Sequence, residues 1–270
     1  MRAERTPAIS AHRGGHEKAA AGTYAAYEFA LAAGADYLEL DARQTGDGTL
    51  VACHRARLGW GRPVAGLAYA ELCRLAGYEV PRIAQVLPLL AGRAGLHLDV
   101  KDSDSAAQAA DLALGSLGPG GVVLTTREPA VGRRLARQFP DLKIGLAVGG
   151  DLVESARFLA RRAVHPGLSR LDPVAAAGAS WAALHYRQAE AGLATQCRER
   201  GVRTLVWTVN TDRALTRWLA CPDVDVLVTD RPARAVAVRD QPASQVAGPD
   251  RAARPGPPDG RSGPAPGPVR

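Results

Sequence analysis

Aromatic residues are scarce in this chain of 270 residues, which contains only three Phe and four Trp. A core drawn from its 46% hydrophobic residues must therefore consist mainly of Ala, Leu and Val, which is typical of helices layered on parallel strands. The formal charge is +7, but Arg is scattered and Lys occurs only three times. Proteins that bind nucleic acid combine dense basic surfaces with stacking aromatics. We therefore expect no nucleic-acid partner.

Closely spaced cysteines and long apolar runs are also absent. The four cysteines form no CxxC pair, which argues against a zinc site or a compact disulfide framework. No window approaches the roughly eighteen uncharged apolar residues of a membrane span, and no apolar stretch follows the charged residues 1–7. We therefore expect a cytoplasmic protein with reduced thiols and no stable membrane insertion.

The composition changes sharply after Asp240. Residues 241–270 contain eight prolines, repeated Gly-Pro steps and no aromatic residue. Such a segment cannot bury enough apolar surface to offset the entropy lost on ordering. We predict one folded domain over residues 1–240 and a disordered Pro/Gly-rich tail over residues 241–270.

Short β-type runs alternate with helical patterns along the folded part, which implies parallel strands. The expected strands are 8–11, 37–41, 50–53, 96–100, 122–124, 143–147, 179–184, 203–208 and 224–228. The expected helices are 23–33, 105–117, 128–139, 152–162, 188–200 and 212–219. Asp47-Gly48 is typical of a tight reversal, so 50–53 should return beside the second strand. The other eight strands predict an α/β fold, a single (β/α)₈ TIM barrel, although a doubly wound sheet would show the same alternation.

Carboxylates gather where two of these strands end. Glu39 and Asp41 share one face of their strand, about 7 Å apart. Because buried unpaired carboxylates are costly, a cation should lie between them, the alternative being two separate Arg salt bridges. On the next barrel strand, Asp99 can supply a third carboxylate and Lys101 a point charge for a phosphate, while His97, lower in the barrel, is expected to be structural. Oxygen ligands alone favour Mg²⁺ or Ca²⁺ over zinc.

Two histidines are expected at the same end of the barrel, where barrel enzymes place their active sites. The first strand leads into His12-Arg13-Gly14-Gly15, and its glycines let a ligand approach the backbone. The return segment leads into His54. A histidine after a strand is ordinary by itself, but two histidines flanking a carboxylate-bound metal can act as general base and general acid near neutral pH.

Taken in order, these segments resemble the glycerophosphodiester phosphodiesterase family. The N-terminal signature is carried by His12-Arg13-Gly14, Thr23, Gly34-Ala35-Asp36, Glu39-Leu40-Asp41, Thr45, Asp47-Gly48 and His54. Further likeness is carried by the Val80-Pro81-Arg82-Ile83 segment before the third strand, the acidic-x-Lys motif Asp99-Val100-Lys101, and the strand ends Val206-Trp207-Thr208-Val209-Asn210 and Val228-Thr229-Asp230-Arg231-Pro232. The resemblance spans residues 8–239.

The resemblance implies metal-dependent hydrolysis of a small-molecule phosphodiester, namely a glycerophosphodiester cleaved to an alcohol and glycerol 3-phosphate. It also implies three groups of site residues. These are the metal ligands Glu39, Asp41 and Asp99, the acid/base pair His12 and His54, and the substrate-binding residues Arg13, Lys101 and Trp207. Arg13 and Lys101 would grip the phosphate, and Trp207 would line the pocket for the alcohol.

The chain departs from the family pattern at three places. Ala21-Gly22 stands where Glu-Asn is usual before the helix, with Glu17 nearby but displaced; Arg55 stands where Asp usually follows the second histidine; and Asp99 is one methylene shorter than the usual Glu. These departures motivate an alternative function, a catalytically weak barrel that binds a phosphorylated ligand.

Overall fold

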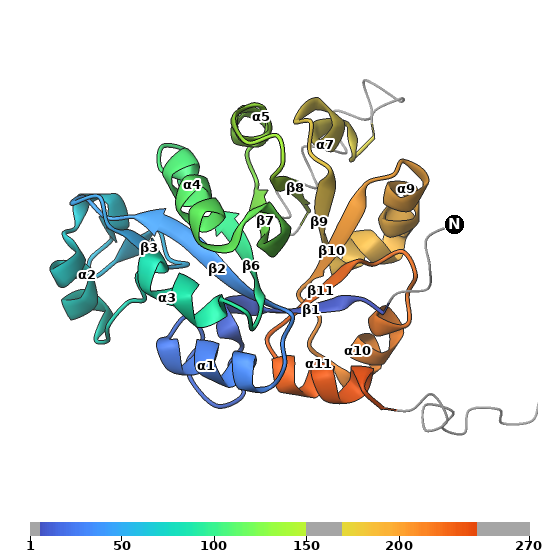
Figure 1. Cartoon of the computed structure of the whole chain (residues 1–270), viewed down its shortest axis with the longest axis horizontal. Helices are drawn as coiled ribbons and strands as arrows, with labels where there is room; N and C mark the ends of the chain where they lie inside the picture. The colour runs from blue at the N-terminus through green and yellow to red at the C-terminus, as the bar shows by residue number, and fades with distance from the viewer. Residues whose placement is uncertain (1–5, 150–168, 242–270) are drawn as a thin grey trace, which may run out of the picture. The chain divides into compact units, whose positions relative to one another are not determined.

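The computed structural model describes residues 6–149 and 169–241. Within these residues, eight parallel strands form a closed barrel surrounded by helices (Figure 1). Strand β1 pairs with both β2 and β11, so the sheet has no free edge at this point. The predicted TIM barrel is therefore confirmed, and the doubly wound alternative is excluded.

All nine predicted strands are present, with small shifts at their ends. The barrel strands are β1 (Ala8–Ala11), β2 (Tyr37–Gln44), β6 (Gly95–Val100), β7 (Val122–Thr126), β8 (Lys143–Val148), β9 (Trp181–His185), β10 (Arg203–Trp207) and β11 (Val226–Thr229). Strand β3 (Leu50–Ala52) lies outside the barrel, and β4 (Arg57–Leu58) pairs with β5 (Arg62–Pro63) in a small hairpin that the sequence analysis did not predict.

The β2–β3 reversal brings the second histidine back to the barrel. Strand β3 runs antiparallel to the end of β2, with Ala52 opposite Ala42. The turn is possible because Gly48 adopts a φ of 83°, a left-handed conformation that favours glycine. After the turn, the Cys53 N–H donates to the Asp41 carbonyl at 2.8 Å. His54, the next residue, is thereby held beside the end of β2.

The helices are α1 (Tyr24–Ala32), α2 (Tyr69–Ala76), α3 (Ile83–Leu90), α4 (Ala106–Leu117), α5 (Pro129–Gln138), α7 (Asp172–Ala176), α8 (Tyr186–Gln188), α9 (Ala194–Glu199), α10 (Asp212–Leu219) and α11 (Pro232–Arg239). Helix α1 begins where predicted because the Thr23 hydroxyl accepts the Ala26 N–H at 3.2 Å. The single helix predicted over 188–200 is wrong: a π-helical turn, Ala189–Leu193, separates α8 from α9, and Gly192 within it has a φ of 88°. The helix predicted over 152–162 lies outside the described residues.

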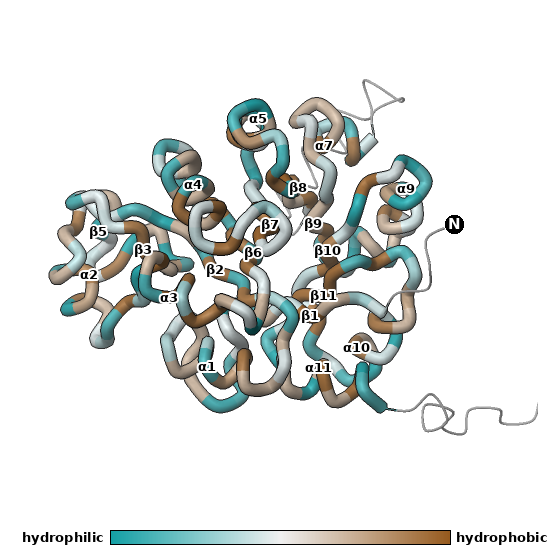
Figure 2. The backbone as a smooth tube through the Cα atoms, in the orientation of Figure 1, coloured by the Kyte–Doolittle hydropathy of each residue, from teal (hydrophilic) through white to brown (hydrophobic). Residues whose placement is uncertain are grey.

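Two apolar layers position the strands. One set of side chains packs between the barrel and the helices, and the alternate set fills the barrel interior. Trp181, Leu205 and Val226 belong to the interior set. The apolar colouring of the central strands is visible in Figure 2. Because side chains alternate along a strand, the inward positions continue upward to the carboxyl ends of the strands, where polar residues replace apolar ones.

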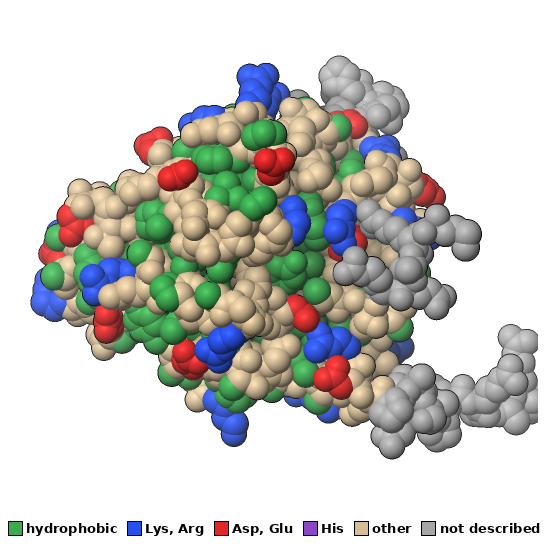
Figure 3. Space-filling view, viewed as in Figure 1, with side chains coloured by type: hydrophobic (Ala, Val, Ile, Leu, Met, Phe, Trp, Pro, Cys, Tyr) green, Lys and Arg blue, Asp and Glu red, His purple; other side chains and the backbone are tan. Residues whose placement is uncertain are grey.

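On the face shown in Figure 3, Lys and Arg side chains are scattered among acidic and apolar ones. The positive charge of the chain is therefore not gathered into one patch on this face. None of the helices in the described part of the chain is long and apolar enough to cross a membrane. The cytoplasmic location stays a prediction.

We propose that residues 1–240 suffice for folding and activity, because the eight barrel strands and the carboxylate cluster described below all lie within them. A chain ending at Asp240 is expected to keep the full-length turnover number and a Tm within about 2 °C of the full-length value. Activity and thermal melting of the two proteins check this. A larger drop in Tm would show that the tail docks on the barrel, and lost turnover at an unchanged Tm would place it over the active-site face.

Candidate active site

Three carboxylates converge at the carboxyl ends of two neighbouring barrel strands. Glu39 and Asp41 extend from β2 and Asp99 from β6, and one oxygen from each lies within 4.8 Å of the others. The strand register places Asp41 directly beside Asp99. Glu39 and Asp41 are each only 3% exposed. The structure thus brings together the three residues predicted as metal ligands.

Lys101 partly neutralises this cluster. Its Nζ lies 2.8 Å from Asp41 Oδ1 and also pairs with Asp99. Although burial favours the neutral amine, the charges of Asp99 and Asp41 raise the pKa of Lys101 to about 12. Burial also raises the pKa of Glu39 well above its usual range, with Asp41 and Asp99 adding to the effect. The ionised form of Glu39 is therefore disfavoured, and a hard divalent cation, which prefers such oxygen donors, would stabilise it.

The alternative of two separate arginine salt bridges does not match the geometry. Glu39 Oε2 accepts the backbone N–H of Arg13 at 2.8 Å, and the Arg13 Nε is 3.9 Å from Asp41 Oδ2. The Arg13 Nε is buried and has no hydrogen-bond partner within the described residues. A buried, unpartnered guanidinium nitrogen beside the carboxylates is suited to bind an anionic group of a ligand.

The turn after β1 holds Arg13 in this position. Arg13 itself is left-handed, with φ 52° and ψ 32°, a conformation that costs energy in a residue other than glycine. A Cβ on Gly14 would lie 2.8 Å from the Tyr27 ring, and one on Gly15 would lie 2.5 Å from Pro232. The two glycines therefore let the turn pack against its neighbours.

His12 is oriented by the last strand of the barrel. Its Nδ1 lies 2.6 Å from Asp230 Oδ1, and Asp230 Oδ2 accepts a hydrogen bond from Asn210 Nδ2 at 2.6 Å. Burial alone would raise the pKa of Asp230, but the bonds from His12 and Asn210 lower it. With Nδ1 committed to the carboxylate, Nε2 of His12 is left for another partner. Sequence reasoning quoted Asp230 and Asn210 only as strand-end motifs and missed this contact.

His54 is held in the same way by a carboxylate of the cluster. Its Nδ1 lies 3.0 Å from Asp41 Oδ2, and its side chain is 54% exposed. Asp41 therefore contacts both His54 and Lys101, and these contacts lower its pKa in spite of burial. Each predicted acid/base histidine thus has one ring nitrogen fixed by a carboxylate and the other available.

The other histidines occupy different positions. His97 is buried between Ser10 Oγ at 3.3 Å and Thr125 Oγ1 at 3.1 Å, and burial lowers its pKa to about 4. It is therefore neutral near pH 7 and deep in the barrel. His16 is 60% exposed, with its Nδ1 4.0 Å from Asp230. His165 lies outside the described residues.

Trp207 ends β10 at the barrel mouth, within a group of rings and cations. Its ring centre is 5.2 Å from that of His185 at the end of β9. The guanidinium carbon of Arg127 is 5.8 Å from the Trp207 ring centre. The sequence analysis did not single out Arg127. Val123 and Thr125 of β7 face inward, and Arg127, two residues further on, falls on the same side by alternation.

A cavity of about 360 Å³ adjoins the carboxylates. Its polar lining includes Arg13, Asp41, His54 and Arg55. Its apolar wall is formed by Leu58, Leu75, Ala76, Tyr78 and Val80, and Ala21-Gly22 also borders it. Two of the three departures from the family pattern, Arg55 and Ala21-Gly22, therefore face this cavity.

Glu17 does not replace the missing acidic residue in the site. Its carboxylate accepts the backbone N–H groups of Ala233 at 2.9 Å and Arg234 at 3.2 Å, in the first turn of α11. Glu17 therefore stabilises a helix start.

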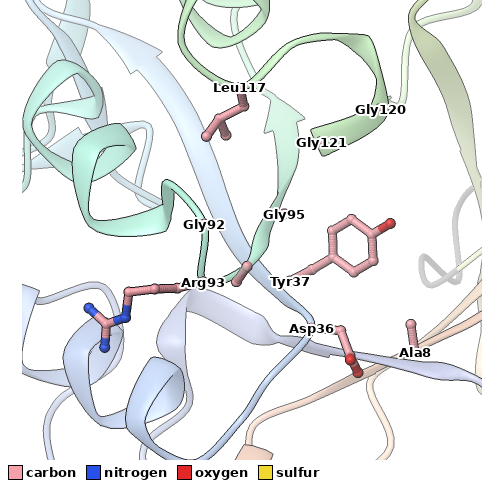
Figure 4. Close-up of a pocket in the computed structure, with 10 residues that line it drawn as sticks. Ala8, Asp36, Tyr37, Gly92, Arg93, Gly95, Leu117, Gly120 and Gly121 are labelled. Carbon is pink, nitrogen blue, oxygen red and sulfur yellow. The ribbon is translucent and has the colours of Figure 1, made fainter.

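A second cavity, of about 480 Å³, lies at the opposite end of the barrel (Figure 4). It is lined by residues that precede or begin strands, including Ala8, Asp36 and Gly95, and the Tyr37 ring extends into it in this view. Arg93 at its rim is paired with Glu28 at 3.2 Å. This cavity shares no lining residue with the carboxylate site, so its larger volume does not make it the reaction site.

Comparison with known proteins agrees with this geometry. Residues 12–87 match the glycerophosphoryl diester phosphodiesterase family. A glycerophosphodiester phosphodiesterase from Caldanaerobacter subterraneus subsp. tengcongensis is 25% identical over 260 residues, covering 83% of this chain and 94% of the relative.

Solved structures give the same result for the fold. A glycerophosphodiester phosphodiesterase from Agrobacterium tumefaciens has a TM-score of 0.64 at 26% identity, and the match covers 86% of this chain and 99% of that one. A glycerophosphodiester phosphodiesterase from Thermotoga maritima has a TM-score of 0.68 at 19% identity, and the match covers 88% of this chain and 100% of that one. A phosphodiesterase from Oleispira antarctica, solved with its product sn-glycerol-3-phosphate, has a TM-score of 0.67 at 17% identity and covers 87% of this chain and 98% of its own.

The barrel and these matches define a phosphoric diester hydrolase. The chain is similar to the glycerophosphodiester phosphodiesterase family in sequence over residues 12–87 and in fold over the barrel.

Proposed function

We propose that the protein hydrolyses a glycerophosphodiester to an alcohol and glycerol 3-phosphate, with a divalent cation and two histidines as acid/base catalysts. The observation that carries the proposal is the arrangement of His12 and His54. Each has its Nδ1 fixed by a carboxylate, and Asp41, the partner of His54, belongs to the carboxylate cluster.

Glu39, Asp41 and Asp99 would hold the cation, Mg²⁺ or Ca²⁺, because their oxygen donors are close together and those of Glu39 and Asp41 are buried. A cation bound there supplies charge stabilisation to a non-bridging phosphate oxygen. Asp99 is shorter than the usual glutamate, but the register beside Asp41 already brings its carboxylate into the cluster.

Arg13 and Lys101 would bind the phosphate. The Arg13 Nε is buried without a hydrogen-bond partner among the described residues, and Lys101 carries a positive charge at the edge of the cluster. Charge-assisted hydrogen bonds from such donors stabilise the additional negative charge of the transition state.

His12 and His54 would move the protons. One imidazole accepts the proton of the attacking hydroxyl through its Nε2, and the other donates a proton to the departing alkoxide oxygen. The attacking group is water, or a neighbouring hydroxyl of the substrate that first forms a cyclic phosphate. The carboxylates on the two Nδ1 atoms stabilise the imidazolium form of each ring, which is formed by the general base and is present at the start in the general acid.

The match of residues 12–87 to the family supports a small-molecule glycerophosphodiester as substrate, and the Oleispira antarctica structure holds sn-glycerol-3-phosphate. Trp207, at the mouth of the barrel and partly exposed, would form the wall against which the alcohol portion lies. The alternative function, a weak catalyst that binds a phosphorylated ligand, is motivated by Arg55 and Ala21-Gly22 at the cavity.

Chelation tests the proposal. The purified full-length chain is expected to hydrolyse at least one glycerophosphodiester in a panel with different alcohols. EDTA should lower the rate by at least about 10²-fold, and added Mg²⁺ or Ca²⁺ should restore it, because three carboxylates without a cation repel the phosphate. Release of glycerol 3-phosphate is the measurement. Binding of the diesters without turnover would favour the alternative, and turnover that is unaffected by EDTA would contradict metal dependence.

A further inference from the structure

Arg127 lies over the proposed reaction site. Along β7, Val123 packs inside the barrel, and Thr125 donates to Asp99 Oδ1 at 2.9 Å. Alternate residues of a strand face the same side, and Arg127 comes two residues after Thr125, one residue beyond the end of β7. Its side chain is therefore expected on the same side as Val123 and Thr125. Its guanidinium carbon is 5.8 Å from the centre of the Trp207 ring, which belongs to a strand across the barrel mouth. The alternation along β7 and the contact with Trp207 both indicate that Arg127 reaches across the entrance of the barrel.

The charge of Arg127 has no counter-charge in the described part of the chain. The residue is exposed and makes no hydrogen bond or ion pair with any described residue. A guanidinium beside an aromatic ring is held by electrostatic attraction while its N–H donors stay available at the rim. Arg127 is therefore placed to bind an oxyanion.

The carboxylates of the site are already engaged. Asp41 and Asp99 contact Lys101, Glu39 accepts from the Arg13 backbone, and Asp230 accepts from Asn210 and lies against His12. The proposed divalent cation and Lys101 would together balance the three carboxylates of the cluster, which then offer no net charge to a cationic group of the substrate. The Trp207 ring, which could otherwise receive a quaternary ammonium, already has a guanidinium next to it.

We propose that the alcohol portion of the substrate carries an anionic group, a carboxylate or a second phosphate, and that Arg127 beside Trp207 binds it. The inference rests on the proposed function, since it assigns the substrate class of that same site. The planar donors of arginine match carboxylate and phosphate oxygens, and the same charge repels choline-type alcohols.

Three diesters of glycerol 3-phosphate test the inference, with 3-hydroxypropanoate, 3,3-dimethylbutan-1-ol and choline as alcohols. These alcohols are anionic, neutral and cationic, and the last two have nearly the same shape. We expect kcat/KM of the full-length protein to fall in this order, with about a tenfold or larger difference between the anionic and cationic esters.

Arg127→Gln is expected to reduce kcat/KM for the anionic ester about tenfold more than for the neutral ester, and Arg127→Glu to reverse the order. Arg137→Gln is the matched control, because it removes the same charge from the exposed face of α5. A preference for the choline ester, or an order that Arg127→Gln leaves unchanged, would overturn the inference. The inference would also be overturned if Arg55→Gln, and not Arg127→Gln, removed the order of kcat/KM among the three esters. The anionic group would then bind in the cavity beside His54.

Failure of the proposed function gives a different result. If the wild-type protein hydrolyses none of the three esters in the presence of Mg²⁺ or Ca²⁺, the proposed hydrolysis is wrong. Calorimetric affinities of the same esters for the wild-type and Arg127→Gln proteins then still decide whether Arg127 selects the anion.

Discussion

Asp41→Asn is expected to lower kcat by about 10³-fold or more, because Asp41 takes part in three separate interactions of the site. One oxygen lies 2.8 Å from Lys101, the other lies 3.0 Å from His54, and the carboxylate also offers a ligand atom to the proposed cation site. An amide would reduce the attraction for the cation and could offer an N–H where His54 requires an acceptor. Steady-state kinetics at saturating Mg²⁺ or Ca²⁺ is the measurement.

Asp36→Asn is the matched control for this variant. Asp36 directly precedes β2, at the opposite end of the barrel, where its carboxylate accepts the Ile9 N–H at 2.7 Å and pairs with Arg239. The charge change is the same, so Asp36→Asn is expected to affect stability while kcat is retained. If Asp41→Asn kept kcat within about tenfold of the wild type, the carboxylate cluster could not be the site of the reaction.

Glu39→Gln separates cation binding from folding. A glutamine oxygen can still accept the Arg13 N–H that Glu39 accepts at 2.8 Å, so the fold should persist. A ligand that binds only the folded state raises its stability, so the wild-type Tm should rise when Mg²⁺ or Ca²⁺ is added after EDTA treatment. In Glu39→Gln this rise should be much smaller. An equal rise in both proteins would mean that the cation binds elsewhere.

The barrel could be predicted from the sequence because its evidence is local. Each strand is a short β-type run and several helices have recognisable starts, such as Thr23 before α1. Where local signals conflict, the prediction failed. Helix α3 contains Pro88, and its range was not predicted as a helix. Gly192 interrupts the helical pattern over 188–200, and the chain changes direction there.

The three clustered carboxylates and the two histidines could be proposed as site residues because alternation along a strand and strand ends define their positions. Glu39 and Asp41 share a face by spacing alone. The partner of His12 could not be identified in this way, because Asp230 is 218 residues away and becomes a neighbour only when β11 pairs with β1. Likewise, the contact of Arg127 with Trp207 requires the curvature of the closed barrel.

His12→Ala is expected to lower kcat by about 10² to 10⁴-fold, the range for loss of a general acid or base, with KM changed less. Asp230→Asn should also lower kcat, by about tenfold or more, because an amide N–H facing Nδ1 would favour the wrong tautomer of the ring. The two residues act as one unit, bonded at 2.6 Å, so the double variant His12→Ala/Asp230→Asn should be no slower than His12→Ala alone.

His16→Ala is the control for the His12 variants, since His16 lies on the same loop and its Nδ1 is 4.0 Å from the same Asp230 oxygen, but it is 60% exposed. Its kcat should stay within about twofold of the wild type. Single-turnover rates with each variant check the set, because they report the chemical step without product release. If the effects of His12→Ala and Asp230→Asn were multiplicative in the double variant, Asp230 would act on the reaction independently of His12. If His16→Ala were as slow as His12→Ala, the proton-transfer role could not be assigned to His12 in preference to His16.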